Sequence, residues 1–316
     1  MSAVVPPPAA SGGITAAVKP VGAAAPGAPS RRRGPQNFYV STARRLLRSR
    51  SGTAGLIALI LLVVVAIFAE PLAPYDPLEQ FADRQLMPPS AQHLFGTDDL
   101  GRDILSRVIY GARVSLFVGI VAVVIGSTVG ISTGLIAGFA GGWLDAVIMR
   151  IWDVLFAFPS ILIGIAIAAI LGPGVTNAAL ALAVVSIPQF SRITRAAVIV
   201  EKAREYVQAA RSIGVSESSI ALRHVLPNTV SPLLVQLSLA MGYAVLLEAG
   251  LSFLGLGARP PEPTWGGMLN TSRQFLREAP YFAIFPGIVL SVLLLGLNYL
   301  SDALRDALDP KLVHLR

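Results

Sequence analysis

The run Gly130-Ile131-Ser132-Thr133-Gly134 matches G-x-S-x-G, the pattern around the nucleophilic serine of many hydrolases. Such a serine needs a base within hydrogen-bond reach. The histidines are His93, His224 and His314, and none lies inside a predicted membrane span. The run also belongs to an apolar stretch rather than to a strand-to-helix turn. We therefore interpret its small residues as a surface for close helix packing and not as a hydrolase site.

A second candidate is the acidic group that follows His93. Asp98, Asp99 and Asp103 lie close to this histidine in the chain and could hold a cation. In the alternative interpretation, Thr97 or Asp98 caps a short helix, because acidic side chains are favourable in a first helical turn. The sequence favours capping over metal binding.

The sequence has no P-loop for binding a nucleotide and no cysteine for thiol chemistry. A P-loop needs G-x-x-x-x-G-K-[ST], but Lys19, Lys202 and Lys311 are followed by Pro, Ala and Leu. The chain has no cysteine, which excludes a disulfide framework, a cysteine zinc site and a thiol nucleophile. We expect no cofactor in this chain, so any ATP and Mg²⁺ that drive it would be bound by another chain.

Composition indicates a membrane protein. Hydrophobic residues make up 54% of the 316 residues, charged residues 14%, and the mean hydropathy is +0.67. Soluble domains carry about 25% charged residues. A soluble core cannot hide this much apolar surface. The expected fold class is therefore all-α and integral to a membrane.

Stretches without charge mark the membrane spans, because a helix needs about 20 mostly apolar residues to cross a bilayer. The longest stretch, Val154 to Ser191, is long enough for two spans, with Gly172-Pro173-Gly174 as the turn between them. Six transmembrane helices are predicted, at about 52–70, 114–138, 151–171, 175–191, 229–248 and 281–301.

Orientation follows from Lys and Arg, which favour cytoplasmic segments. A cytoplasmic N-terminus puts 18 of these residues inside and 7 outside. Both termini are therefore predicted to be cytoplasmic, and topology, rather than nucleic-acid binding, explains the net charge of +7. Residues 1–50 are predicted to be a disordered, Ala/Pro-rich and basic tail, 51–311 the membrane domain and 312–316 a cytoplasmic end. The outside loops are predicted at 71–113 and 249–278, and an inside loop at 192–228.

The inside loop contains a predicted amphipathic helix from Glu205 that ends at Gly214, with Ser216 starting the next helix. This helix could lie on the membrane, but small alanines are poor membrane anchors and favour docking into a partner's groove. Its apolar residues at helical spacing are Tyr206, Ala209, Ala210 and Ile213.

Glu248, at the boundary of the fifth span, is the one acid close to membrane depth. Such a residue is a functional candidate, although a side chain near a span end can also simply reach water. The loop that follows is rich in Pro and Gly, so we expect ordered turns and a short helix near 267–277.

The inside loop resembles the EAA loop of permease subunits of ABC importers. The resemblance rests on Gln208-Ala209-Ala210, Gly214 and the run Arg223 to Asn228. In that family the loop forms a coupling helix that docks in a cleft of the ATP-binding subunit. Gln208 replaces the usual Glu, which removes a charge but leaves the small alanine pair. The residues implied in coupling are Glu205, Gln208, Ala209, Ala210, Ile213 and Gly214.

Residues of about 40–311 further resemble the C-type permease of the dipeptide, oligopeptide and nickel group. The first-loop signature runs from His93 to Asp103. The C-terminal signature includes Glu248, Trp265-Gly266 and the run Asp302 to Pro310. The residues implied to face a binding protein are Thr97, Asp98, Gly101, Arg102, Asp103 and Trp265.

The resemblance implies a type I ABC-importer permease fold and a non-catalytic subunit in a bacterial inner membrane. Its implied partners are a homologous second permease, two ATP-binding subunits and an extracytoplasmic peptide-binding protein, and its implied cargo is a dipeptide or oligopeptide. Nickel or haem import within the same group remains an alternative. So does an ion-coupled secondary transporter, for which Glu248 would be the candidate acid.

Overall fold

The computed structural model describes residues 46–47 and 49–308, so nearly all of the predicted tail and the predicted end at 312–316 lie outside the described residues. In this part the fold is helical, with one isolated bridge between Thr97 and Asp103 and no strand. The elements are α2 Arg50–Ile67, α3 Ala69–Leu72, α4 Ile104–Ala140, α5 Gly142–Phe156, α6 Ser160–Leu171, α7 Val175–Lys202, α8 Glu205–Ser212, α9 Glu217–Ser219, the π-helix η1 Ile220–Val225, α10 Leu226–Asn228, α11 Val230–Phe253, α12 Trp265–Ser272, the 3-10 helix η2 Arg273–Phe275 and α13 Tyr281–Leu308.

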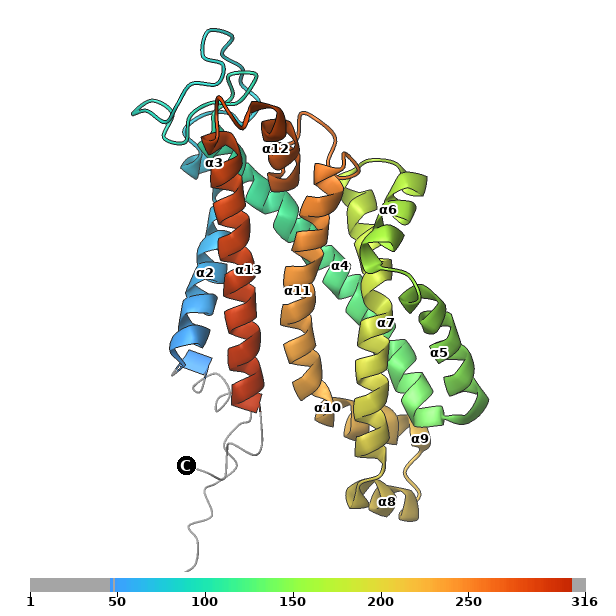
Figure 1. Ribbon diagram of the computed structural model, residues 1–316. Helices are drawn as coiled ribbons and strands as arrows, with labels where there is room; N and C mark the ends of the chain where they lie inside the picture. Colours follow the sequence, from blue (N-terminus) through green and yellow to red (C-terminus); the bar gives the residue numbers. More distant parts are fainter. Residues whose placement is uncertain (1–45, 48, 309–316) are drawn as a thin grey trace, which may run out of the picture. The chain divides into compact units, whose positions relative to one another are not determined.

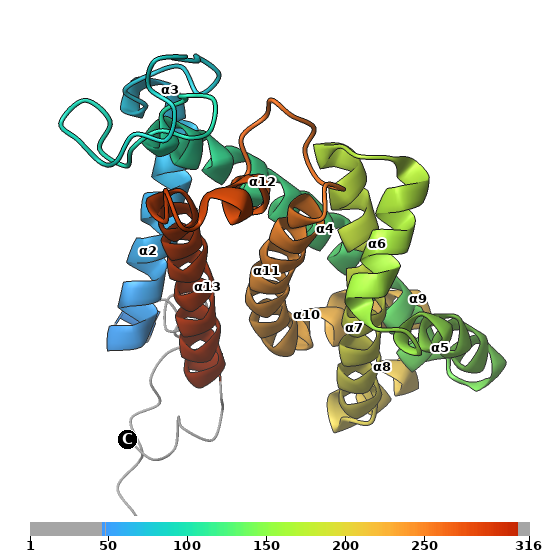
Figure 2. The same cartoon turned by 45° about the horizontal axis from the view of Figure 1, so that its top comes forward.

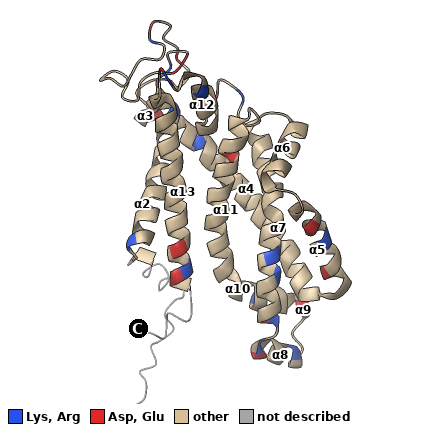
Figure 3. Ribbon diagram, viewed as in Figure 1, with Lys and Arg blue, Asp and Glu red and all other residues tan. Residues whose placement is uncertain are grey.

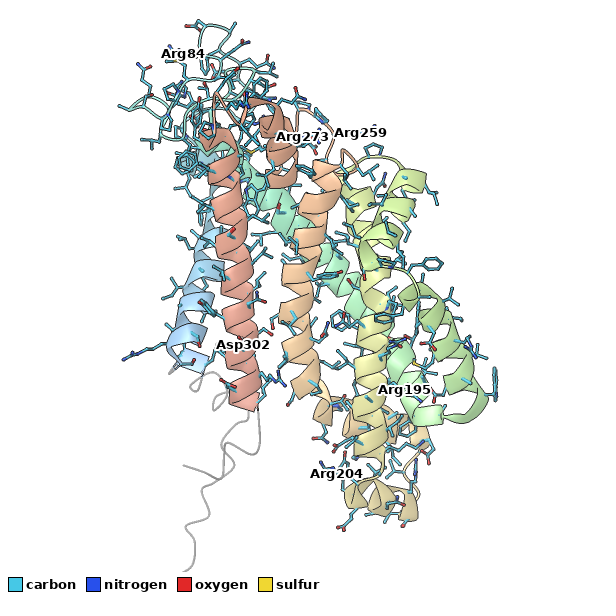
Figure 4. The ribbon with its side chains drawn as sticks, in the orientation of Figure 1. Arg84, Arg195, Arg204, Arg259, Arg273 and Asp302 are labelled. Atoms are coloured by element: carbon cyan, nitrogen blue, oxygen red, sulfur yellow. The ribbon has the colours of Figure 1, made fainter. Side chains whose placement is uncertain are left out.

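The long helices run between two ends of the described part (Figures 1 and 2). We call one the loop end, which carries residues 73–103 and 254–280, and the other the α8 end, which carries α8, α9, η1 and α10. Most charged side chains lie toward these two ends (Figure 3). Figure 4 shows Arg84, Arg259 and Arg273 at the loop end and Arg204 at the α8 end. This distribution is the one expected of helices that cross a bilayer.

Five helices are long and apolar enough to span a membrane: α2, α4, α7, α11 and α13. The span predicted at 151–171 falls on two helices instead of one. These are α5, which begins at Gly142, and α6, bent by 88° at a short break. The pair counts as a sixth span if it is a single broken one. Pro159 explains the break, because proline disfavours a helical conformation at the preceding Phe158 and lacks a backbone N–H.

Three helices extend beyond the apolar stretches that predicted them. α4 begins at Ile104, so the first loop ends at 103 instead of 113, and α7 and α13 continue to Lys202 and Leu308. Arg113 shows why a charge does not end a helix here. Its guanidinium donates to the carbonyls of Ala66, at 2.6 Å, and Ile67, at 2.9 Å, and so satisfies groups at the end of α2. Uncharged stretches therefore mark the part of a helix that lies in the apolar core of the membrane, and not the full length of the helix.

Glycines at every fourth position from Gly126 to Gly138 of α4 allow α7 to approach closely. A Cβ atom added at Gly130 would lie 2.5 Å from the Cβ of Phe190, and one at Gly134 would collide with the carbonyl of Ser191. The hydroxyl of Ser132 is exposed and donates to the carbonyl of Thr128 in the same helix, at 2.7 Å. The G-x-S-x-G run is therefore part of a helix contact, as predicted.

We expect Gly130→Leu to destabilise the permease by at least about 1–3 kcal/mol, because a bulky side chain must separate two backbones already in contact. Ser132→Ala is the matched control in the same run and should change stability by less than about 0.5 kcal/mol. Thermal unfolding in detergent measures both. Equal effects of the two substitutions would contradict the packing role.

Candidate functional site

α8 is fixed to the rest of the chain by one buried face. Val207 and Ala210 are buried, three residues apart, and belong to an apolar cluster that we call the α8 anchor. The anchor joins α8 to α4, α7 and η1, so a force on α8 acts on two long helices. Its other buried members are Leu135, Val198, Ile220, Ala221 and Val225.

The opposite face of α8 is exposed. The prediction of one apolar face containing both alanines was wrong, because neighbouring residues on a helix point about 100° apart. Ala210 is buried in the anchor, whereas Ala209 is exposed and Ile213, just after the helix, is 80% exposed. The missed residue is Val207, which its spacing from Ala210 could have revealed. The predicted coupling residues on the exposed side are Glu205, Gln208, Ala209, Ile213 and Gly214.

α8 ends as predicted at Gly214, which has φ +82°, a conformation that favours glycine. The N–H of Gly214 donates to the carbonyl of Arg211, at 3.0 Å, and the N–H of Val215 donates to the carbonyl of Ala210, at 3.1 Å. These two bonds form a Schellman motif. Ser216 then precedes α9, also as predicted.

Polar contacts hold the residues that follow α8, up to Asn228, against this helix. The Arg211 guanidinium donates to both carboxylate oxygens of Glu217, at 2.8 and 2.9 Å, which lowers the pKa of Glu217. Because that pKa is lowered in the folded state, this link is present at neutral pH and is lost as the pH falls through the lowered value. The amide of Asn228 donates to the Tyr206 hydroxyl, at 3.3 Å, which ties the end of the segment to α8.

At the loop end, Asp98 pairs with two buried guanidinium groups. Its carboxylate accepts from Nε of Arg102 at 2.7 Å and lies 3.4 Å from Nε of Arg107. It also accepts from the backbone N–H groups of Leu100 and Arg102, both at 2.9 Å. All three charged side chains are buried. Asp98 is therefore the centre of the folded first loop.

Asp103, not Thr97 or Asp98, caps a helix here, and that helix is the long α4 rather than a short one. Its carboxylate accepts from the N–H and the hydroxyl of Ser106, both at 2.8 Å, and lies 3.0 Å from Nδ1 of His93. The Thr97 hydroxyl instead donates to the carbonyl of Arg84. In the described chain no three His, Asp or Glu side chains come together as a metal site would require.

Trp265 is completely buried, and its Nε1 donates to the carbonyl of Val108 on α4, at 3.0 Å. All six residues that were implied to face a binding protein are thus buried within this chain: Thr97, Asp98, Gly101, Arg102, Asp103 and Trp265. They shape the two loops, so any partner at this end meets other, exposed residues of the same loops.

Glu248 does not reach water. Its side chain is 1% exposed and accepts hydrogen bonds from the hydroxyls of Ser115 on α4, at 3.0 Å, and Ser252 in its own helix, at 2.7 Å. The carboxylate thus joins α4 to α11 inside the bundle. A buried, satisfied acid of this kind is a packing element between helices.

Two family matches cover much of this architecture. Residues 130–314 match the family described as binding-protein-dependent transport system inner membrane component. Residues 38–89 match the N-terminal TM domain of oligopeptide transport permease C. The first match contains α7, α8, α11 and α13, and the second contains α2.

Curated relatives match over most of their length. The dipeptide transport system permease protein DppC of Alkalihalophilus pseudofirmus is 46% identical over 269 residues, which cover 85% of this chain and 88% of the relative. The glutathione transport system permease protein GsiD of Escherichia coli is 49% identical over 270 residues, 85% of this chain and 89% of the relative.

A solved structure shows the same fold. The chain resembles the MetNI methionine ABC transporter in an inward-facing conformation, with a TM-score of 0.55 and 17% identity over 65% of this chain and 98% of the other. The family match over 130–314 and the curated relatives show that this chain belongs to the inner-membrane components of binding-protein-dependent transport systems, the permease subunits of ABC importers.

Proposed function

We propose that this chain is the C-type permease of an ATP-driven importer of dipeptides or oligopeptides, and that α8 couples it to an ATP-binding subunit. The exposed face of α8 around Ala209, fixed in place by the α8 anchor, carries the proposal. Relatives named for dipeptide and glutathione transport, both small peptides, support the cargo class. Nickel and haem are the less supported alternatives.

The proposed complex contains this chain, a homologous second permease, two ATP-binding subunits and an extracytoplasmic peptide-binding protein. ATP and Mg²⁺ bind the ATP-binding subunits, and this chain holds no cofactor. Closure of those subunits would push α8, and the anchor would pass the movement to α4 and α7. Coupling of this kind requires that the ATP-binding subunits bind the two permease conformations with different affinity.

The excess of Lys and Arg in the segments predicted to be inside supports a cytoplasmic position for the α8 end and for both termini. The loop end would then face the outside of the bacterial inner membrane, where a binding protein delivers its cargo.

Glu248→Gln separates this proposal from an ion-coupled carrier. We expect the variant to keep roughly half or more of wild-type uptake, because an amide oxygen still accepts from a buried hydroxyl while no proton or ion needs to be carried. Ser115→Ala is the control, because it removes the hydroxyl that donates to the Glu248 carboxylate and leaves the carboxylate itself in place. Loss of uptake in Glu248→Gln with Ser115→Ala unaffected would favour ion coupling.

The composition of the complex tests the main proposal. The chain is tagged, extracted gently in detergent and purified, and ATP hydrolysis is measured with and without binding protein and dipeptide. We expect a second permease and ATP-binding chains to co-purify, with hydrolysis that rises when both are added. Recovery of this chain alone without hydrolysis, where a related complex survives the same extraction, would contradict the proposal.

A further inference from the structure

A cavity of about 480 Å³ is lined by α7, α11 and α13 and by the two residues that flank the break between α5 and α6. In both ribbon views α13, α11, α7 and the α5–α6 pair follow one another in this order (Figures 1 and 2). Its volume is within the range of cavities that bind small molecules, about 300–1,000 Å³. Its lining includes six residues with polar side chains, namely Ser160, Ser186, Gln189, Gln236, Tyr243 and Asn298.

The cavity lies toward the α8 end of the predicted membrane spans. Gln189 and Asn298 are near the ends of the apolar stretches at 175–191 and 281–301, and Arg192 follows Gln189 one turn later in α7. Polar groups here need a partner in the protein, a water-filled path or a ligand.

Three amide side chains in the cavity lack such a partner. Among the described residues none forms a hydrogen bond with the side chain of Gln189, Gln236 or Asn298. By contrast, the nearby Ser186 hydroxyl donates to the carbonyl of Leu182 in its own helix, at 2.8 Å. Each amide has two N–H donors and an acceptor oxygen, which no other described residue occupies; Gln189 and Asn298 are exposed and Gln236 is buried. The three amides come from three different helices, α7, α11 and α13, and converge on one cavity.

The lining is also neutral. No Asp, Glu, Lys or Arg is among the lining residues that the structure describes, and Glu248 lies elsewhere between α4 and α11. Amides and hydroxyls are poor ligands for Ni²⁺, which prefers imidazole and softer groups. They do match the N–H and C=O groups of a peptide main chain, which are the same whatever side chains the peptide carries.

We propose that Gln189, Gln236 and Asn298 form a neutral site that hydrogen-bonds the main chain of a short peptide as it passes through the membrane. This inference rests on the proposed function, and it names the residues that this chain would contribute to the route of the peptide through the membrane. Because the site binds groups common to all peptides, it contributes little discrimination between peptide sequences.

The test uses the complete complex in liposomes, with ATP-dependent uptake of a radiolabelled dipeptide and ATP hydrolysis measured side by side. The main variant is Gln189→Leu combined with Asn298→Leu. Both side chains are exposed in this chain, so their replacement should not disturb its core. We expect uptake to fall about tenfold, the effect of losing two hydrogen bonds in the path. Hydrolysis stimulated by the binding protein should persist, because no residue of α8 or of the α8 anchor lines the cavity.

A matched control and a second variant complete the design. Thr128→Val removes an exposed hydroxyl on α4, outside the cavity, and should transport as wild type. Gln236→Asn keeps an amide in the cavity and should retain more uptake than Gln236→Leu. Wild-type uptake in the double variant, or a parallel loss of uptake and hydrolysis, would overturn the site. Absence of dipeptide uptake by the unmodified complex would instead overturn the proposed function.

Discussion

We expect Ala209→Arg to reduce ATP-driven uptake on the order of 100-fold while the permease itself stays folded. Ala209 is exposed on the face of α8 that the α8 anchor leaves free. A long charged side chain there would prevent close docking and would lose its hydration at the interface without a partner, which costs several kcal/mol. Uptake in liposomes and the yield of ATP-binding subunits on a tagged permease measure the effect.

The adjacent alanine is a matched control with the opposite expected result. Ala210 is buried in the α8 anchor, so Ala210→Arg should destabilise the permease and lower its melting temperature in detergent. Ala209→Arg should leave that melting temperature unchanged. Normal transport by Ala209→Arg would show that this face of α8 does not dock. A lowered melting temperature in Ala209→Arg would show that Ala209 supports the fold instead.

Asp98→Ala should destabilise the loop end by about 3–5 kcal/mol, the cost of removing one partner from a buried ion pair. The guanidinium groups of Arg102 and Arg107 would remain buried without the carboxylate that now faces both. Two backbone N–H groups would also lose their acceptor. Limited proteolysis of the first loop and thermal unfolding of the purified complex measure the loss.

Asp83 provides the control in the same loop. Its carboxylate lies 3.7 Å from Nε of Arg84, but the side chain is 80% exposed. Exposed pairs of this kind contribute about 0–1 kcal/mol, so Asp83→Ala should have little effect on stability. If Asp98→Ala is as stable as Asp83→Ala but loses binding-protein-stimulated hydrolysis, Asp98 acts in partner contact and the structural role is wrong.

The apolar stretches predicted the five long helices because a membrane imposes one simple requirement, a run of about 20 apolar residues. The helix ends were predicted less well. Arg113 lies inside α4, where carbonyls of α2 receive its guanidinium, and this partner comes from 46 or 47 residues away. The proline at position 159 is a local signal for a break, but neither the break nor its 88° bend was predicted.

The sequence by itself determined the membrane class, the family resemblance and the two ends of α8, because each depends on composition or on residues close together in the chain. Gly214 ends α8 through bonds to residues 210 and 211. Only the tertiary structure decided that Ala209 is free and Ala210 buried, that Glu248 is enclosed by two hydroxyls, and that three amides share one cavity. In a uniformly apolar helix the residues do not show which side faces a neighbour, and only packing against other helices decides it.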